Sequence, residues 1–143
     1  MSQLTDFNAV LDDLAALLAE IAPTRLVTRD LKDWSQHAPA ARAGGVFTIL
    51  PGPRTGYGYE YRPGDLPRVQ IFIFGERLLS EKAPGRAVDT EENAMARDIE
   101  RLAERAPETP GLEEITLQSI TPAAQTMAPT ASVLAVLIYG VDR

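Results

Sequence analysis

The sequence predicts an α/β (α+β) protein in which two amphipathic helices pack on a mixed, mainly antiparallel sheet of about five strands. Two observations predict this fold. Apolar residues recur every three or four positions in segments 4–21 and 89–106, which is the period of a helix buried on one side. Short runs rich in Val, Ile, Phe and Tyr lie between and after these segments and are bounded by Pro and Gly, as strands are.

Length and composition narrow the possible functions. The 143 residues fit a single domain, 1–143, that can enclose one hydrophobic core. The net charge of -6 and the scattered basic residues disfavour a nucleic-acid-binding surface, which needs clustered Lys or Arg. With no cysteine, disulfides, thiol catalysis and thiolate metal sites are excluded. The sequence shows neither an export signal nor a long apolar run, so we expect a soluble cytoplasmic protein.

The first predicted helix spans residues 4–21, with Ser2 or Thr5 as its N-cap and Pro23 after its end. Its apolar face is opposite a stripe of carboxylates that recur every seven residues, namely Asp6, Asp13 and Glu20. Such a stripe is usually a solvated helix face. Repeated around a ring, it would line a channel and repel a passing polyanion, so it is a candidate channel-facing acidic stripe.

The middle of the chain predicts a connector and a hairpin. Residues 24–44 are interpreted as a connector with one helical turn and a possible short strand at 25–28. A short strand at 46–50, which ends at Pro51, precedes a long β-hairpin within 54–74.

The hairpin is the most distinctive part of the sequence. Tyr57, Tyr59 and Tyr61 alternate along its first strand and share one face, and a Pro63-Gly64 turn follows. Its second strand, 69–74, is apolar at nearly every position, so we expect it to be covered on both faces in the middle of the sheet. The tyrosine row is suited to stacking bases, but Glu60 and the few nearby basic residues favour packing against protein.

The last part of the chain predicts a second helix and two strands. After a mobile loop at 78–88, Asp89 and Glu92 have the spacing of a capping box, so the helix is predicted to begin at Asp89 and to end before Pro107. Strands are predicted at 114–121 and 132–139, and the second is apolar enough for the sheet centre.

No pattern in the chain indicates catalysis. The only histidine, His37, lies in the connector, where it is interpreted as an exposed or hydrogen-bonded loop residue. No metal-binding or phosphate-binding motif occurs, and the glycines fit turns. The sequence therefore predicts neither an enzyme nor a cofactor.

The order of elements resembles that of the tail terminator proteins of long-tailed bacteriophages, the group that includes the minor tail protein U of lambda-like phages. Three features carry the resemblance: Arg68-Val69-Gln70-Ile71-Phe72-Ile73-Phe74 before a loop, the helix at 89–106, and a final strand Ala135-Val136-Leu137-Ile138-Tyr139-Gly140-Val141. The resemblance covers almost the whole chain and rests on pattern, not on residue identity.

The resemblance implies a structural virion protein that closes into a hexameric ring on the end of the tail tube. The ring would end tube polymerisation and meet the head-side connector or head completion protein, and DNA would pass through without specific binding. Localisation would be the tail or neck of the virion, and the host cytoplasm during assembly. The loops 61–67 and 78–88 and the tyrosine row are candidates for the subunit or tube interface, through Tyr57, Tyr59, Tyr61, Arg62, Asp65, Arg68, Lys82 and Arg86.

Two alternatives remain open. A tail completion or head-to-tail joining protein has the same overall pattern. A small cytoplasmic α/β domain that binds a ligand, or that uses carboxylates for catalysis, belongs to another class, and a deep apolar pocket with converging carboxylates would favour it.

Overall fold

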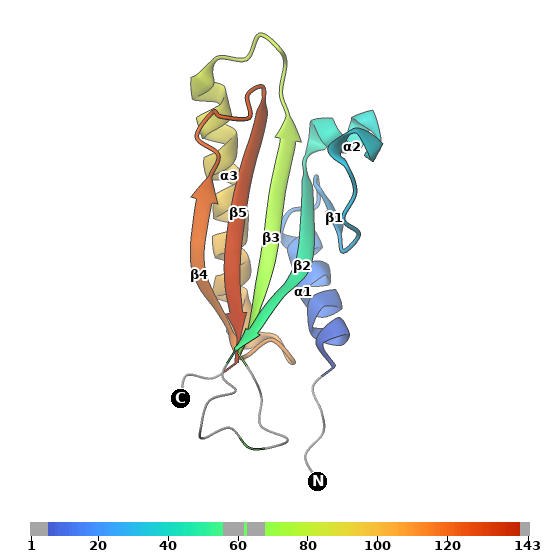
Figure 1. The fold of residues 1–143 in the computed structure, drawn as a ribbon, viewed down its shortest axis with the longest axis vertical. Helices are drawn as coiled ribbons and strands as arrows, with labels where there is room; N and C mark the ends of the chain where they lie inside the picture. The colour runs from blue at the N-terminus through green and yellow to red at the C-terminus, as the bar shows by residue number, and fades with distance from the viewer. Residues whose placement is uncertain (1–5, 56–61, 63–67, 141–143) are drawn as a thin grey trace.

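In the computed structural model, the described residues 6–55, 62 and 68–140 form a five-stranded sheet with two long helices on one face (Figure 1). The strand order is β1-β2-β3-β5-β4. β1 (Leu26–Thr28) runs parallel to β2 (Val46–Thr55). β3 (Arg68–Leu78), β5 (Thr130–Tyr139) and β4 (Ile115–Pro122) continue the sheet with antiparallel pairs. The predicted α+β fold with a mixed, mainly antiparallel sheet is confirmed.

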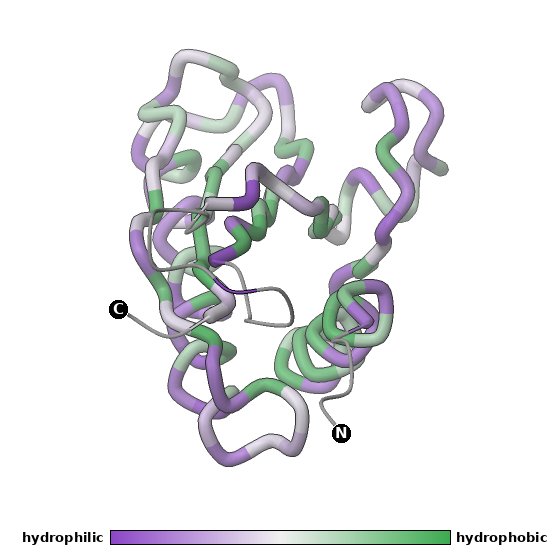
Figure 2. Tube along the Cα trace, turned by 60° about the horizontal axis from the view of Figure 1, so that its bottom comes forward, coloured by the Kyte–Doolittle hydropathy of each residue, from purple (hydrophilic) through white to green (hydrophobic). Residues whose placement is uncertain are grey.

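The first helix, α1 (Phe7–Ile21), begins later than predicted because its N-cap is Asp6, not Ser2 or Thr5. Asp6 Oδ1 accepts hydrogen bonds from the backbone N–H groups of Asn8 and Ala9, at 3.0 and 3.4 Å. A capping carboxylate satisfies donors that the first turn leaves unpaired. Figure 2 shows hydrophobic and hydrophilic residues alternating around the turns of α1, as the predicted amphipathic pattern requires.

The second long helix, α3 (Gly85–Arg105), begins at Gly85 and not at Asp89. Pro84 stands at its N-cap position, and the predicted loop at 78–88 is reduced to residues 79–84. The predicted capping box was wrong, because Glu92 lies in the middle of α3 and is buried. Its carboxylate accepts a hydrogen bond from the backbone N–H of Ser132, not from the start of the helix. Shorter helical segments are η1 (Trp34–Gln36), α2 (Pro39–Gly44) and η2 (Ala106–Glu108).

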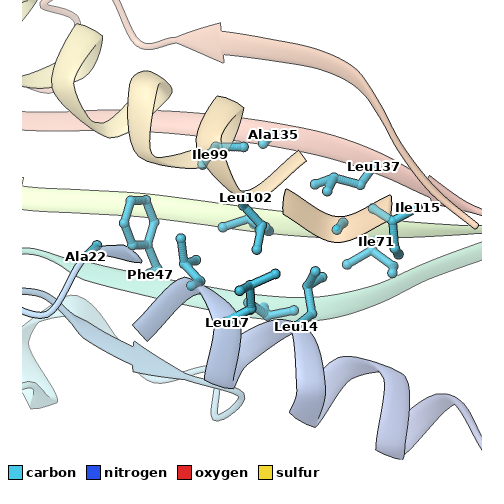
Figure 3. Packing of buried hydrophobic residues seen from close by; sticks show 14 of the residues in the cluster. Leu14, Leu17, Ala22, Phe47, Ile71, Ile99, Leu102, Ile115, Ala135 and Leu137 are labelled. Carbon is cyan, nitrogen blue, oxygen red and sulfur yellow. The ribbon is translucent and has the colours of Figure 1, made fainter. Parts of the chain in front are cut away.

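The hydrophobic core lies between the sheet and the two long helices (Figure 3). Leu14 and Leu17 of α1 and Leu102 of α3 converge there on strand residues such as Phe47 and Ile71. The expected buried face of α3 is confirmed, since Met95, Ile99, Leu102 and Ala106 have no exposed surface.

One glycine lets α3 approach β3 closely. A Cβ atom on Gly75 would lie 2.8 Å from Phe47 Cε1 and 3.1 Å from Met95 Sδ. Any larger residue at this position would therefore push the helix or the phenyl ring away from the sheet.

The first strand of the hairpin differs from the prediction. β2 does not end at Pro51 but continues to Thr55 with a register shift between Pro51 and Arg54. Proline is tolerated there because β1 pairs with β2 only as far as Thr48, so this part of β2 is an edge. Residues 48–54 of β2 therefore occupy the positions opposite 69–74, and the predicted Tyr57, Tyr59, Tyr61 strand lies outside the described residues.

The central position of β3 and β5 is confirmed, but the expectation that β3 is covered on both faces was wrong. β5 alternates strictly between buried and half-buried residues, and β3 does so from Arg68 to Glu76. The buried set faces the helices, and the other set faces away from them. Because the strands are apolar on both faces, the sequence alone did not show that only one face is covered by helices.

Candidate functional site

The sheet face opposite the helices carries a row of apolar side chains. Register places Leu50 beside Phe72 and Phe72 beside Val136, and it places Phe74 beside Leu134, with Ile138 further along β5. All are half-buried, and none belongs to the core or packs against it. We call this surface the apolar sheet face, defined by Leu50, Phe72, Phe74, Leu134, Val136 and Ile138.

Hydroxyl side chains border the apolar sheet face along β4. Thr116, Ser119 and Thr121 lie opposite Ile138, Val136 and Leu134, respectively, and all three are exposed. Segment 115–122 carries no charged residue. An apolar centre with a polar, uncharged rim is the usual composition of a surface that binds protein.

Part of the connector lies near the end of β3. His37 was expected to be exposed or hydrogen-bonded, and the exposed state is wrong because His37 is buried. The centre of its ring lies 5.8 Å from that of Trp34. It also lies near Glu76 of β3. Burial raises the pKa of the Glu76 carboxyl above its ordinary value, and the His37 imidazole offsets part of that rise. His37 is therefore packed against the fold, whereas Trp34 and Glu76 are half-buried.

The predicted interface residues separate into two groups. Arg68 opens β3, opposite Thr55, whereas Lys82 and Arg86 lie beyond the other end of that strand. Arg62, Lys82 and Arg86 are exposed, and Arg68 is half-buried. Tyr57, Tyr59, Tyr61 and Asp65 lie outside the described residues, so their predicted contacts stay predictions.

A hollow of about 530 Å³ lies where β3 ends and α3 begins. Its apolar wall is formed by Leu79, Ala83, Pro84 and Ala87, and Arg77, Arg86 and Glu91 also line it. We call it the β3–α3 hollow. It contains two arginines and one carboxylate, and so differs from the converging carboxylates of the enzymatic alternative.

An ion-pair cluster supports one side of this hollow. Glu91 lies between two arginines: Arg77 Nη1 donates to Glu91 Oε2 at 2.7 Å, and Arg25 Nη1 is 2.5 Å from Glu91 Oε1 at an angle outside hydrogen-bond geometry. Arg25 Nε donates to Asp98 Oδ2 at 3.0 Å, and Arg77 Nε donates to the Ala43 carbonyl at 2.7 Å. The cluster joins the segment before β1, the end of β3, α2 and α3.

The glycine just before β2 leaves space for the side chain of Arg25. Gly45 has a φ of 100°, and a Cβ atom there would lie 2.7 Å from Arg25 Nη1. The guanidinium also stands 5.6 Å from the centre of the Phe47 ring. Arg25 is thus held in a fixed position, which indicates a structural role for the cluster.

The acidic stripe of α1 is exposed, but its members have different surroundings. Asp6 caps the helix. Glu20 Oε1 accepts a 3.3 Å hydrogen bond from Arg105 Nη2 of α3. Asp13 lies near Gly111. The helix itself has no basic residue, yet the tertiary structure supplies one, so the three carboxylates are not an equivalent, unbalanced row.

Sequence reasoning missed the apolar sheet face and the ion-pair cluster. In β3 the residues Ile71, Phe72, Ile73 and Phe74 are all apolar, so period-two alternation gave no signal for the open face. Arg25 and Arg77 are far from each other in the sequence and far from Glu91 and Asp98 of α3. Each of the four residues, taken alone, would be interpreted as a surface charge.

No protein-family model matches the chain, and none of the curated proteins is similar to it. Among the described residues, no helix has the length and apolar character needed to cross a bilayer. The same part of the chain holds no group of three or more Asp, Glu, His or Cys residues placed to bind a metal ion.

Proposed function

We propose that this protein is the terminator of a phage tail, a structural subunit that closes into a hexameric ring on the end of the tail tube. The observation that carries the proposal is the apolar sheet face, which the helices leave uncovered. The resemblance of element order adds the specific role. The protein would act without a cofactor and would catalyse no reaction.

The apolar sheet face supports a binding role for a physical reason. Large contiguous apolar patches are unusual on monomeric proteins and mark surfaces that contact another protein. Phe72 and Phe74 lie at its centre on β3, and aromatic side chains are enriched in the cores of interfaces. The sheet beneath is rigid, because its opposite face is fully packed against α1 and α3. We infer that this face contacts the end of the tube.

The two edges of the sheet also support a ring. One edge consists of the three-residue β1 and a part of β2 with Pro51 and Pro53, whereas the other is the eight-residue β4. Because the edges differ, neighbouring subunits can meet head to tail, which closes into a ring when the rotation permits it. The proposed partners are other copies of this chain, the tail tube protein, and a connector or completion protein on the head side. The proposed location is the virion.

A tail completion or head-to-tail joining role would use the same surfaces. The two roles differ in which partner the apolar sheet face binds. A terminator binds the tube end, and a joining protein binds the head side only.

The decisive experiment is tube termination in vitro. The tail tube protein encoded with this chain would be polymerised with and without the purified protein, and tube lengths would be measured by electron microscopy. We expect the wild type to stop elongation and Phe72→Lys to lose this effect. Glu100→Lys, an exposed change on α3 and so on the other side of the sheet, is the control and should still stop elongation.

Native mass spectrometry would test the ring separately. A discrete six-subunit species, alone or on tube ends, is the expected result. Tubes that keep growing in the presence of wild-type protein would overturn the terminator role, and binding only to head-side components would favour the joining role.

A further inference from the structure

The β3–α3 hollow has the chemistry of a site for an apolar group that carries a negative charge. Its wall is apolar, and Arg86 is exposed at its rim, where it makes no ion pair within the described residues. Arg77 donates through Nε and Nη1, and its Nη2 has no acceptor in that part of the chain. The start of α3 adds positive potential, because no side chain caps it. Glu91 is engaged by Arg77 and Arg25, so its charge is offset.

After β1, the same chain exposes an apolar side chain with carboxylates beside it. Leu31 is 72% exposed, the largest exposure among the large hydrophobic residues that the structure describes. It lies between Asp30 and Lys32, and Asp33 follows closely, so two carboxylates and one ammonium group surround it. Both aspartates are exposed, and neither side chain is bonded within the described residues. Arg29 anchors the start of this segment by donating to Asp12 Oδ1 at 2.7 Å. We call residues 29–33 the Leu31 loop.

We propose that the β3–α3 hollow receives the Leu31 loop of a second copy of this chain, with Leu31 against the apolar wall and Asp30 against Arg86. The hollow, at about 530 Å³, falls within the size range of about 300–1,000 Å³ typical of pockets that bind ligands, so it has room for a leucine side chain and a carboxylate. This inference rests on the proposed ring, and it identifies the contact that joins neighbouring subunits.

The positions of the two surfaces fit a ring. The Leu31 loop follows β1, the edge strand, whereas the passage from β3 into α3 lies at one end of the sheet (Figure 1). Residues of that passage line the hollow. Each subunit therefore offers its loop to one neighbour and its hollow to another. This is a heterologous contact, and repetition by a closing rotation gives a ring. It leaves the apolar sheet face free for the tube.

The test uses the absence of native cysteine from the chain. Leu31→Cys and Ala83→Cys would be purified separately as full-length proteins, mixed and oxidised. Two Cys residues form a disulfide only when their Cα atoms come within about 7 Å. We expect a covalent dimer in the mixture at several times the yield seen with either variant alone. Leu26→Cys mixed with Ala83→Cys is the matched control, since Leu26 is also an exposed leucine of the same region, at 44%.

A charge exchange tests the polar half of the contact. Arg86→Glu should weaken self-association on the order of tenfold, as loss of a close interfacial charge pair does. Adding Asp30→Arg to the same chain should restore it, because the pair is rebuilt with opposite signs. Both changes are on exposed side chains, so circular dichroism should show an unchanged fold.

The outcomes separate this inference from the proposed function. The proposed contact of Leu31 with the β3–α3 hollow is overturned if Leu31→Cys and Ala83→Cys form no more disulfide than the control pair. It is also overturned if Arg86→Glu leaves self-association unchanged. If a six-subunit ring that stops tubes still forms in that case, the proposed function stands without it. If the cross-link forms at high yield but tubes keep growing, the contact is supported and the terminator role fails. Monomers at every concentration, without cross-link, also overturn the contact.

Discussion

The carboxylate of Glu92 accepts a 2.9 Å hydrogen bond from the backbone N–H of Ser132. Its other oxygen accepts from the N–H of Ala124 at 3.1 Å. Ala124 and Gln125 both have positive φ, at 52° and 70°, in the connection between β4 and β5. A single buried side chain of α3 therefore holds a connection whose backbone departs from the conformations that these residues prefer.

Glu92→Ala should lower the free energy of unfolding by about 2–4 kcal/mol, because two backbone donors lose a charged acceptor. Urea denaturation followed by circular dichroism would measure it. Glu100→Ala, an exposed change on the same helix, is the control and should stay within about 0.5 kcal/mol of wild type. Equal effects of the two changes would contradict the role given to Glu92.

Glu91→Ala should destabilise the protein by about 3–5 kcal/mol, because it leaves Arg25 buried without its nearest carboxylate. The side chains of Arg25 and Glu91 are each 10% exposed. Replacing both, as Glu91→Ala with Arg25→Leu, should recover part of the loss. A double-mutant cycle from denaturant melts measures the coupling, and strictly additive effects would show that the two residues do not interact.

Glu76 should make stability depend on pH. Burial raises the pKa of its carboxyl in the folded protein, so folding favours the protonated form. The contribution to stability is complete below the ordinary glutamate pKa of about 4.3 and is lost as the pH rises through the raised value. Glu76→Gln should therefore melt at a higher temperature than wild type at pH 8, with a smaller difference at pH 4. The same difference at both values would contradict this assignment.

The acidic stripe should be tested one residue at a time. Asp6→Ala should cost about 1 kcal/mol of stability, because the N-cap of α1 is lost. Asp13→Lys should change stability by about 0.5 kcal/mol or less, since Asp13 is exposed and makes no ion pair within the described residues. Thermal melts distinguish the two. Because Asp13→Lys leaves stability nearly unchanged, it tests a channel-facing role better than a change at Asp6. Normal infectivity of particles that carry Asp13→Lys would count against that role.

Neighbouring residues on β3 should respond differently because they face opposite sides of the sheet. Ile73→Ala removes a side chain with no exposed surface and should cost about 2–5 kcal/mol. Phe72→Ala removes a larger but half-buried side chain on the apolar sheet face and should cost less. Denaturant melts of both variants test this order, and a greater loss for Phe72→Ala would show that its face is covered within the monomer.

Local sequence patterns were sufficient to predict the main helices and the central strands. The 3.6-residue period of α1 and α3 and the apolar runs of β3 and β5 predicted both helices and the two central strands. Their boundaries were less well predicted. The start of α3 was misplaced because the spacing of Asp89 and Glu92 fits a capping box as well as a helix interior. Only tertiary contacts show that Glu92 bonds to Ala124 and Ser132.

Which sheet face is covered, and which charged side chains form ion pairs, depends on contacts between segments far apart in the chain. Phe72 and Ile73 are equally apolar, so their different surroundings follow from the placement of both helices on one side. Arg25, Arg77 and Glu91 meet because β1, β3 and α3 end or begin in the same region, a consequence of chain topology that no local pattern records. Local periodicity is set by backbone geometry within a few residues, whereas surfaces and ion pairs depend on contacts between segments far apart in the chain.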